Sequence, residues 1–120
     1  MINQDRLINT FLELVRIDSP SGQEAEIGQH LAARLQALGL ETAFDDIGNL
    51  IGLLDGTGDD WLLLSAHMDT VGTDTGIEPV IRDGVIYSAG DTILGGDDKS
   101  GVAAILEVLQ TLREQELAHP

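Results

Sequence analysis

Residues 61–71 read Trp-Leu-Leu-Leu-Ser-Ala-His-Met-Asp-Thr-Val, a nearly continuous apolar run that ends in a histidine and an aspartate. Such a run predicts a strand over residues 61–66 that is buried on both faces. Ligands of open α/β sheets commonly bind beyond the carboxyl ends of the strands, where His67 and Asp69 lie. Because residues two apart in an extended chain point the same way, these two side chains can share a face.

Three segments around this strand have apolar residues at helical spacing. We expect helices over residues 3–17, 21–38 and 101–116. Ser21 followed by Glu24 has the form of a capping box, which would begin the second helix. Gly39 fits the cap at the end of the same helix.

The remaining segments predict strands. We expect strands over residues 41–45 and 49–54, and a hairpin in which 80–82 and 85–87 flank Asp83-Gly84. This order of elements predicts an α/β fold with a mixed sheet flanked by helices. The last helix follows a buried strand, and such a layer should continue with another strand. We therefore expect an incomplete sheet, with residues 1–120 forming part of a larger domain.

Composition narrows the function classes. The 120 residues contain no cysteine, so a metal would have to be bound by His, Asp or Glu. A net charge of −15 disfavours nucleic acid and anionic membranes as partners, although most of this charge suits an ordinary solvated surface. The first residues have no apolar signal sequence and no apolar run is long enough to cross a bilayer, so we expect a cytoplasmic protein.

A second polar motif, Gly95-Gly96-Asp97-Asp98-Lys99-Ser100-Gly101, lies about 30 residues after His67. It joins a loop to the start of a helix, where backbone N–H groups favour anionic side chains. If the loop returns to the same sheet edge, a carboxylate of this motif can meet His67. A nitrogen and oxygen site of that kind suits zinc, manganese or cobalt.

Each motif also has a plainer interpretation. His67 could be a lone histidine at the end of a strand, with Asp69 as a local cap. Paired aspartates between glycines are common in loops and as helix caps. Either motif alone leaves these alternatives open, whereas the order and spacing of the two together favour a metal site.

Together, residues 67–71 and 96–101 resemble the paired motifs of the peptidase T/aminoacylase/glutamate carboxypeptidase family of two-zinc metallopeptidases. Residues 76–87 and the loop 17–22 are similar to its peptidase T-like, tripeptide aminopeptidase branch. The resemblance covers nearly the whole chain. It implies that residues 1–120 are the N-terminal part of a zinc-peptidase (phosphorylase/hydrolase-like) catalytic domain. The lid and dimerisation domain and the C-terminal half would be absent.

The resemblance implies a role for each matched position. His67 would bind one zinc ion, and Asp97 would bridge two, with Mn²⁺ or Co²⁺ as substitutes. Asp69, a catalytic residue by resemblance, would orient His67 and tune its basicity. The peptide bond after the bridging aspartate is commonly cis in this family, which here is Asp97–Asp98.

Other residues of the motifs are expected to support the site without binding metal. Asp98 and Lys99 match the motif without being ligands, and Lys99 would pair with nearby carboxylates. Gly96 and Gly101 would let the backbone turn tightly. We interpret three late carboxylates as solvated surface groups: Glu107, Glu114 and Glu116.

The resemblance implies that the parent protein hydrolyses small peptides, as an aminopeptidase acting on tripeptides and as a possible homodimer. The family's general base, a Glu of a downstream Glu-Glu pair, and its remaining ligands have no match here, so residues 1–120 alone should be inactive. Two alternatives remain: an N-acyl amino acid deacylase or carboxypeptidase of the same superfamily, and a non-catalytic interaction module.

Overall fold

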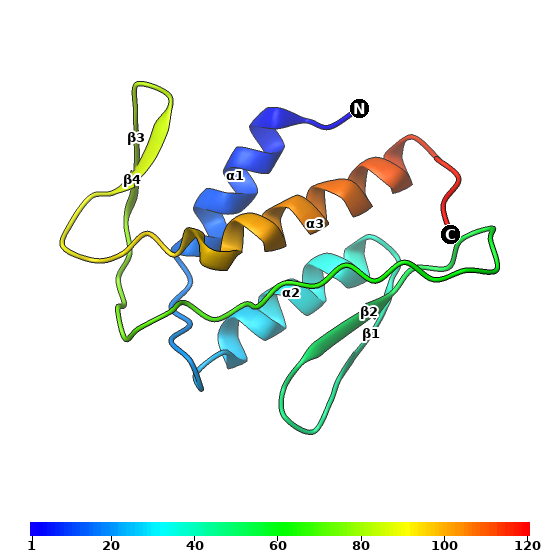
Figure 1. The fold of residues 1–120 in the computed structure, drawn as a ribbon, viewed down its shortest axis with the longest axis horizontal. Helices are drawn as coiled ribbons and strands as arrows, with labels where there is room; N and C mark the ends of the chain where they lie inside the picture. Colours follow the sequence, from blue (N-terminus) through cyan, green and yellow to red (C-terminus); the bar gives the residue numbers. More distant parts are fainter.

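The computed structural model describes residues 1–120. It contains three helices and two β-hairpins, so the predicted α/β class is confirmed (Figure 1). The helices are α1 (Gln4–Val15), α2 (Ala25–Ala37) and α3 (Gly96–Glu114), and the strands are β1 (Glu41–Phe44), β2 (Leu50–Leu53), β3 (Pro79–Arg82) and β4 (Val85–Ser88). Each lies within a few residues of the expected bounds, except that α2 begins four residues late and α3 five residues early.

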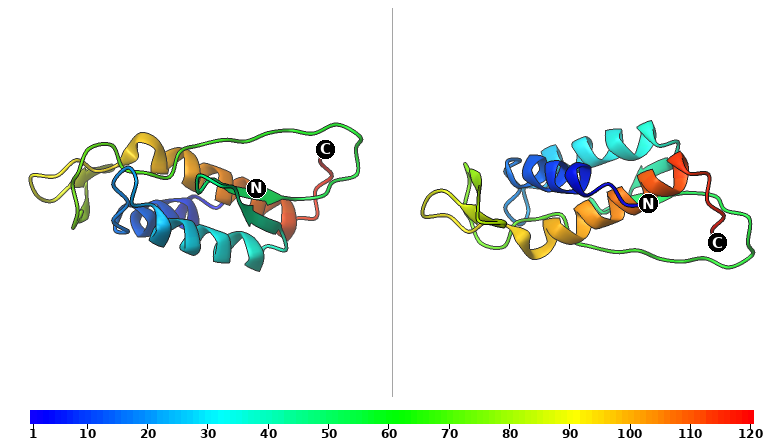
Figure 2. Two further views of the ribbon diagram at one scale, coloured as in Figure 1. Left: turned by 90° about the horizontal axis from the view of Figure 1, so that it is seen from below. Right: turned by 90° about the horizontal axis from the view of Figure 1, so that it is seen from above.

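The core lies where α1, α2 and α3 meet (Figure 2). Leu14, Val15 and Ile27 have no exposed surface, and burying side chains of this size stabilises the fold by about 1.5–3 kcal/mol each. Nine buried apolar residues make up this core: Phe11, Leu14, Val15, Ile27, Leu31, Ile77, Val102, Ala103 and Leu106. Apart from Ile77, all of them belong to the three helices, which therefore form the stable frame behind the loops.

The two ends of α2 test the predicted helix caps at Ser21 and Gly39. Gly39 has a φ of +88°, and Leu40 N donates to Leu35 O at 3.1 Å, so the predicted cap after α2 is confirmed. The predicted capping box is wrong, because Ser21 does not bond the first turn of α2. Its hydroxyl donates to Asp69, and Glu24 accepts a bond from the Gly22 N–H instead.

Both hairpins form antiparallel pairs. In the second one, β3 and β4 are joined by Asp83 (φ +51°) and Gly84 (φ +77°). Two consecutive positive φ values match the tight two-residue turn that Asp-Gly predicts. However, β1–β2 and β3–β4 remain separate two-stranded sheets. The single mixed sheet that we expected is therefore not formed within these residues.

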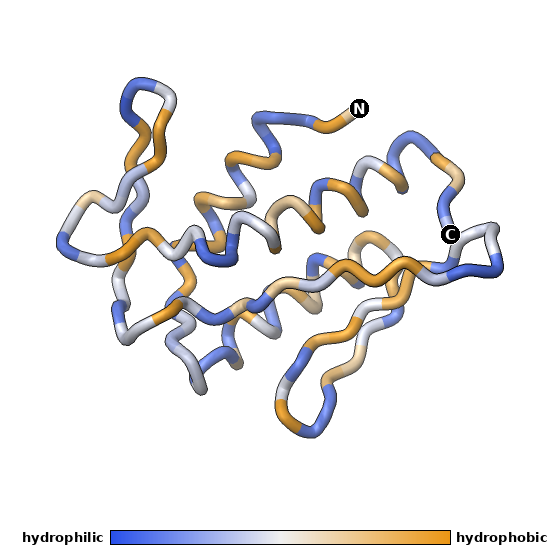
Figure 3. Tube along the Cα trace, viewed as in Figure 1, coloured by the Kyte–Doolittle hydropathy of each residue, from blue (hydrophilic) through white to orange (hydrophobic).

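Residues 61–66 do not form the buried strand that we expected, so this prediction is wrong. Residues 58–69 form no backbone–backbone hydrogen bond and cross one side of the molecule as a single extended segment (Figure 2). Figure 3 shows that a stretch in the middle of this segment is strongly apolar, yet Trp61 is 72% exposed and Leu63 is 86% exposed. A strand needs a neighbour that satisfies its backbone groups, and no segment of residues 1–120 pairs with this one. The sequence of residues 61–66 has the apolar pattern of a buried strand, but no neighbouring strand hydrogen-bonds to it.

Residues 1–120 are less compact than a typical domain of this length. Its radius of gyration is 15.0 Å, compared with about 13.6 Å expected for a compact domain of this length. None of the three helices is long and apolar enough to cross a membrane.

Candidate metal site

His67 stands between two carboxylates at the end of the extended segment. Its Nε2 lies 2.9 Å from Asp97 Oδ1, and its Nδ1 lies 2.9 Å from Asp69 Oδ1. The structure therefore brings together the three predicted site residues. Asp97 raises the pKa of His67 above its ordinary value, and Asp69 adds to this effect. Without a metal, the doubly protonated ring is favoured because each N–H has a carboxylate acceptor.

Asp69 is held from behind by the loop between α1 and α2. The Ser21 hydroxyl donates to Asp69 Oδ2, while Oδ1 faces His67. The Ser21 hydrogen bond is the main reason that the pKa of Asp69 is lowered, and His67 acts in the same direction. Asp69 therefore stays ionised and can accept a hydrogen bond from the Nδ1–H of His67, while Nε2 faces Asp97.

The two aspartates at the start of α3 have different tasks. Asp97 has a non-helical backbone and exposes 77% of its side chain beside His67. Asp98 accepts a hydrogen bond from Gly101 N at 3.0 Å, which is the bond of a helix N-cap. The cap interpretation is thus correct for Asp98, whereas Asp97 is the aspartate of this pair that contacts His67. The predicted cis bond between them is confirmed.

Glycines shape this turn, although not both of the expected ones. Gly95 has a φ of +88°, whereas Gly96 is not in the left-handed region, so the tight turn is at Gly95. Gly101 matters for space: a Cβ there would lie 2.5 Å from both carboxylate oxygens of Asp98. A larger residue at Gly101 would displace the capping carboxylate.

Lys99 corrects a further prediction. It forms no salt bridge, has no exposed surface, and donates from Nζ to the carbonyl oxygen of Ile17 at 2.9 Å. Burial lowers the pKa of Lys99, and the nearby charges of Asp18 and Asp69 oppose that effect. Lys99 therefore connects the beginning of α3 to the loop that also contains Ser21.

Glu107 is not the surface residue that we expected. It is 3% exposed and accepts two bonds from Arg6, one from Asn3 N and one from Thr111. Arg6 also binds Glu114, and both Glu114 and Glu116 are exposed, as predicted. The available signal was the helical spacing of Glu107, which lies four residues after Ala103 and four before Thr111, both of them buried.

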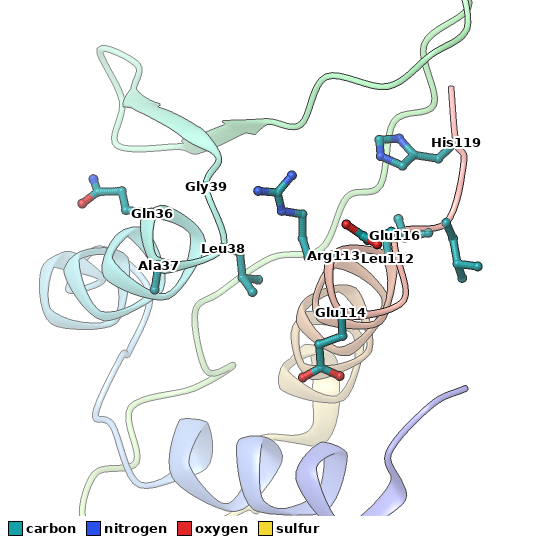
Figure 4. A pocket seen from close by; sticks show the side chains of 10 residues that line it. Gln36, Ala37, Leu38, Gly39, Leu112, Arg113, Glu114, Glu116 and His119 are labelled. Carbon is teal, nitrogen blue, oxygen red and sulfur yellow. The ribbon is translucent and has the colours of Figure 1, made fainter.

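Of the two most prominent hollows, one reaches the site. A pocket of about 660 Å³ lies between the C-terminal ends of α2 and α3, where Arg113 faces Gly39 (Figure 4). It contains none of the three predicted site residues. A larger groove of about 770 Å³ runs under the extended segment and includes His67 and Asp69. Most residues that line this groove are apolar.

The donor atoms fit a zinc site in kind but not in number. His67 Nε2 and Asp97 Oδ1 converge, and Asp69 supplies the outer hydrogen bond that metal-binding histidines usually have. However, no group of three or more His, Cys, Asp or Glu residues is arranged so that all of them could hold a metal ion. Protein zinc sites normally use at least three protein ligands, so residues 1–120 provide part of a site.

The three helices, the two hairpins and this convergent His–Asp pair define part of a peptidase catalytic domain. The chain belongs to peptidase family M28, whose family model matches residues 49–119. The match covers more than half of the chain and includes both motifs.

Solved structures confirm the resemblance to the tripeptide aminopeptidase branch. A tripeptidase from Staphylococcus aureus is 46% identical, with a TM-score of 0.94 over 99% of this chain and 35% of that chain. Aminopeptidase PepT from Bacillus cereus is 43% identical, with a TM-score of 0.89 over 98% of this chain and 34% of that chain. The uncharacterised protein YqjE of Bacillus subtilis is 41% identical over 99% of this chain and 34% of its own length. The chain thus spans about a third of the length of these relatives.

Proposed function

We propose that residues 1–120 supply the first part of the metal centre of a peptidase that removes residues from the N-terminus of small peptides, tripeptides among them. The observation that carries this proposal is the convergence of His67 Nε2 and Asp97 Oδ1 at 2.9 Å. The similarity to a tripeptidase and to an aminopeptidase supports the reaction class and the substrate.

In this proposal, His67 and Asp97 would hold zinc, with Asp97 as the bridging ligand that the family resemblance implies. Bound zinc supplies Lewis-acid catalysis by polarising the carbonyl of the peptide bond to be cleaved. Mn²⁺ or Co²⁺ would suit the same nitrogen and oxygen donors.

The chain's own residues prepare His67 for that role. Asp69 accepts a hydrogen bond from the Nδ1–H of His67, so the ring keeps the orientation in which Nε2 faces Asp97. The Nε2 proton that is present without metal must leave when a metal binds, because a ligand nitrogen needs its lone pair. Asp69 therefore acts through His67 as an orienting residue.

We further propose that these 120 residues alone are inactive. The predicted ligands number two, and no glutamate side chain forms a hydrogen bond or ion pair with His67 or Asp97 that could make it the general base. Calorimetry on the 120-residue chain should therefore show weak zinc binding or none. Tight binding of two zinc ions would contradict this proposal.

The activity is tested on the longer protein that contains this chain. We expect it to cleave tripeptides, to lose activity on chelation, and to lose it permanently when His67 is replaced by alanine. His119→Ala is the matched control, because the one hydrogen bond of the His119 side chain is to the neighbouring Pro120 carbonyl. Cleavage of N-acyl amino acids in place of tripeptides would support the deacylase alternative. Inactivity towards both would support the non-catalytic module. The expected cytoplasmic location and homodimer stay predictions.

A further inference from the structure

The loop between α1 and α2 is bonded to the segment that contains His67. Thr70 N donates to Ser19 O at 2.7 Å, and Ser19 Oγ donates to Met68 O at 3.2 Å. Ser19 and Thr70 are fully or almost fully buried, so these bonds are shielded from water. The backbone on either side of Asp69 is therefore fixed to this loop.

The same loop is fixed from a second direction by α3. Lys99 Nζ donates to Ile17 O at 2.9 Å, and Lys99 follows the Asp97-Asp98 motif directly. Residues 17–21 thus lie between the two motifs and are bonded to both. At the far end of this loop, Ser21 presents its hydroxyl to the outer oxygen of Asp69.

We propose that Ser21 is a positioning residue, which holds the Asp69 carboxylate so that His67 keeps its proton on Nδ1 and presents Nε2 to the metal side. The importance of Nε2 rests on the proposed function, while the hydrogen-bonded series from Ser21 through Asp69 to His67 does not. Ser21 acts through Asp69 and touches neither His67 nor Asp97.

The position of Asp69 matters because His67 has a carboxylate next to each of its ring nitrogens. A neutral imidazole has one N–H, and Asp69 and Asp97 compete for it at equal distances of 2.9 Å. Asp97 is mostly exposed and its side chain is hydrogen-bonded to His67 alone, whereas Asp69 is also bonded on its other oxygen by Ser21. Holding Asp69 still favours Nδ1–H. The Asp69 backbone carbonyl, 3.2 Å from Nδ1, is a longer second acceptor.

The test is the tautomer of His67 in the metal-free 120-residue chain, read from the ¹⁵N chemical shifts of its ring. Measurements are made at a pH above the pKa of His67, where the ring is neutral. In the natural sequence we expect the Nδ1–H tautomer to dominate. Loss of one hydrogen bond in Ser21→Ala should lower the ratio of Nδ1–H to Nε2–H by about two- to tenfold.

Two further variants make the result specific. Ser21→Thr keeps the hydroxyl and should restore the natural ratio. Ser88→Ala makes the same chemical change in the β3–β4 hairpin, where Ser88 contacts only Thr92 through its side chain, and should leave the ratio unchanged. Ser21→Cys, which weakens the donor with little change of shape, should shift the ratio in the direction of the alanine variant if the latter does not fold.

An unchanged tautomer in the folded Ser21 variants would overturn the proposal, as would an equal shift in Ser88→Ala. Because this measurement needs no metal and no turnover, its failure is distinct from failure of the proposed function. If the Ser21 variants shift the tautomer as predicted but the longer protein binds no metal, the role of Ser21 stands and the peptidase proposal is rejected.

Discussion

Nε2 of His67 lies 2.9 Å from Oδ1 of Asp97, although 30 residues separate them in the chain. The contact exists because the segment ending at His67 and the turn before α3 both lie against the loop of residues 17–21. The candidate site is therefore built from loops, while the helices behind them provide the stable frame. This division predicts that stability and metal binding can be changed separately.

Substitutions of Asp98 and Asp97 should separate the effect on stability from the effect on the candidate metal site most clearly. Asp98→Ala removes the N-cap of α3 and should destabilise the chain by about 1 kcal/mol, as cap deletions typically do. Asp97→Ala removes an exposed side chain and should change stability by less than about 0.5 kcal/mol. Urea unfolding of the two variants checks both values. Equal destabilisation by the two changes would contradict the different tasks assigned to these neighbours.

Glu107 should matter more than any other carboxylate for stability. Glu107→Gln leaves Arg6 without its buried partner and should cost about 2–4 kcal/mol. Chemical denaturation measures this change. Glu41→Gln, an exposed carboxylate in β1 with no hydrogen-bonded partner, is the control and should change stability by less than about 0.5 kcal/mol.

Acid should weaken the same contact. Arg6 lowers the pKa of Glu107 to about 2, from an ordinary value of 4.5. The unfolded chain then binds a proton more readily than the folded chain, so stability falls as the pH falls. The contribution of Glu107 is complete above about pH 4.5 and is lost as the pH falls through about 2. The difference in unfolding free energy between the natural chain and Glu107→Gln should shrink over this range. A constant difference would contradict the assigned ion pair.

The extended segment should make the isolated 120-residue chain associate. Leu63 is 86% exposed in a stretch whose backbone groups have no partners, and unpaired edges of this kind pair with other chains. Leu63→Lys should therefore reduce concentration-dependent association in sedimentation measurements. Ile47→Lys, at an equally exposed position in the β1–β2 turn, is the control. Association that is equal in the natural chain and Leu63→Lys would assign it to another surface.

The sequence predicted the helices and hairpins because their signals are local. Asp83-Gly84 adopts the two positive φ values that its turn requires, and Gly39 ends α2 as expected. The proximity of His67, Asp69 and Asp97 was also predictable, since the resemblance implied the pairing of His67 with Asp97. The strand over residues 61–66 was not, because strand formation depends on neighbours that a local pattern does not reveal.

Long-range polar contacts were missed for the same reason. Ser21 has the local sequence pattern of a helix cap. In the structure, however, its hydroxyl donates to Asp69, which lies 48 residues away in the chain. Glu107 and Lys99 have charges that normally indicate solvent exposure. Arg6 and the Ile17 carbonyl, which allow their burial, are distant in sequence.

The most direct test of the central claim is anomalous diffraction at the zinc edge from crystals of the longer protein. We expect two peaks, one bound by His67 Nε2 and both contacted by Asp97, with Asp69 on the opposite nitrogen of His67. A zinc-loaded active enzyme with no anomalous peak near His67 and Asp97 would contradict the assignment of these residues to the metal centre.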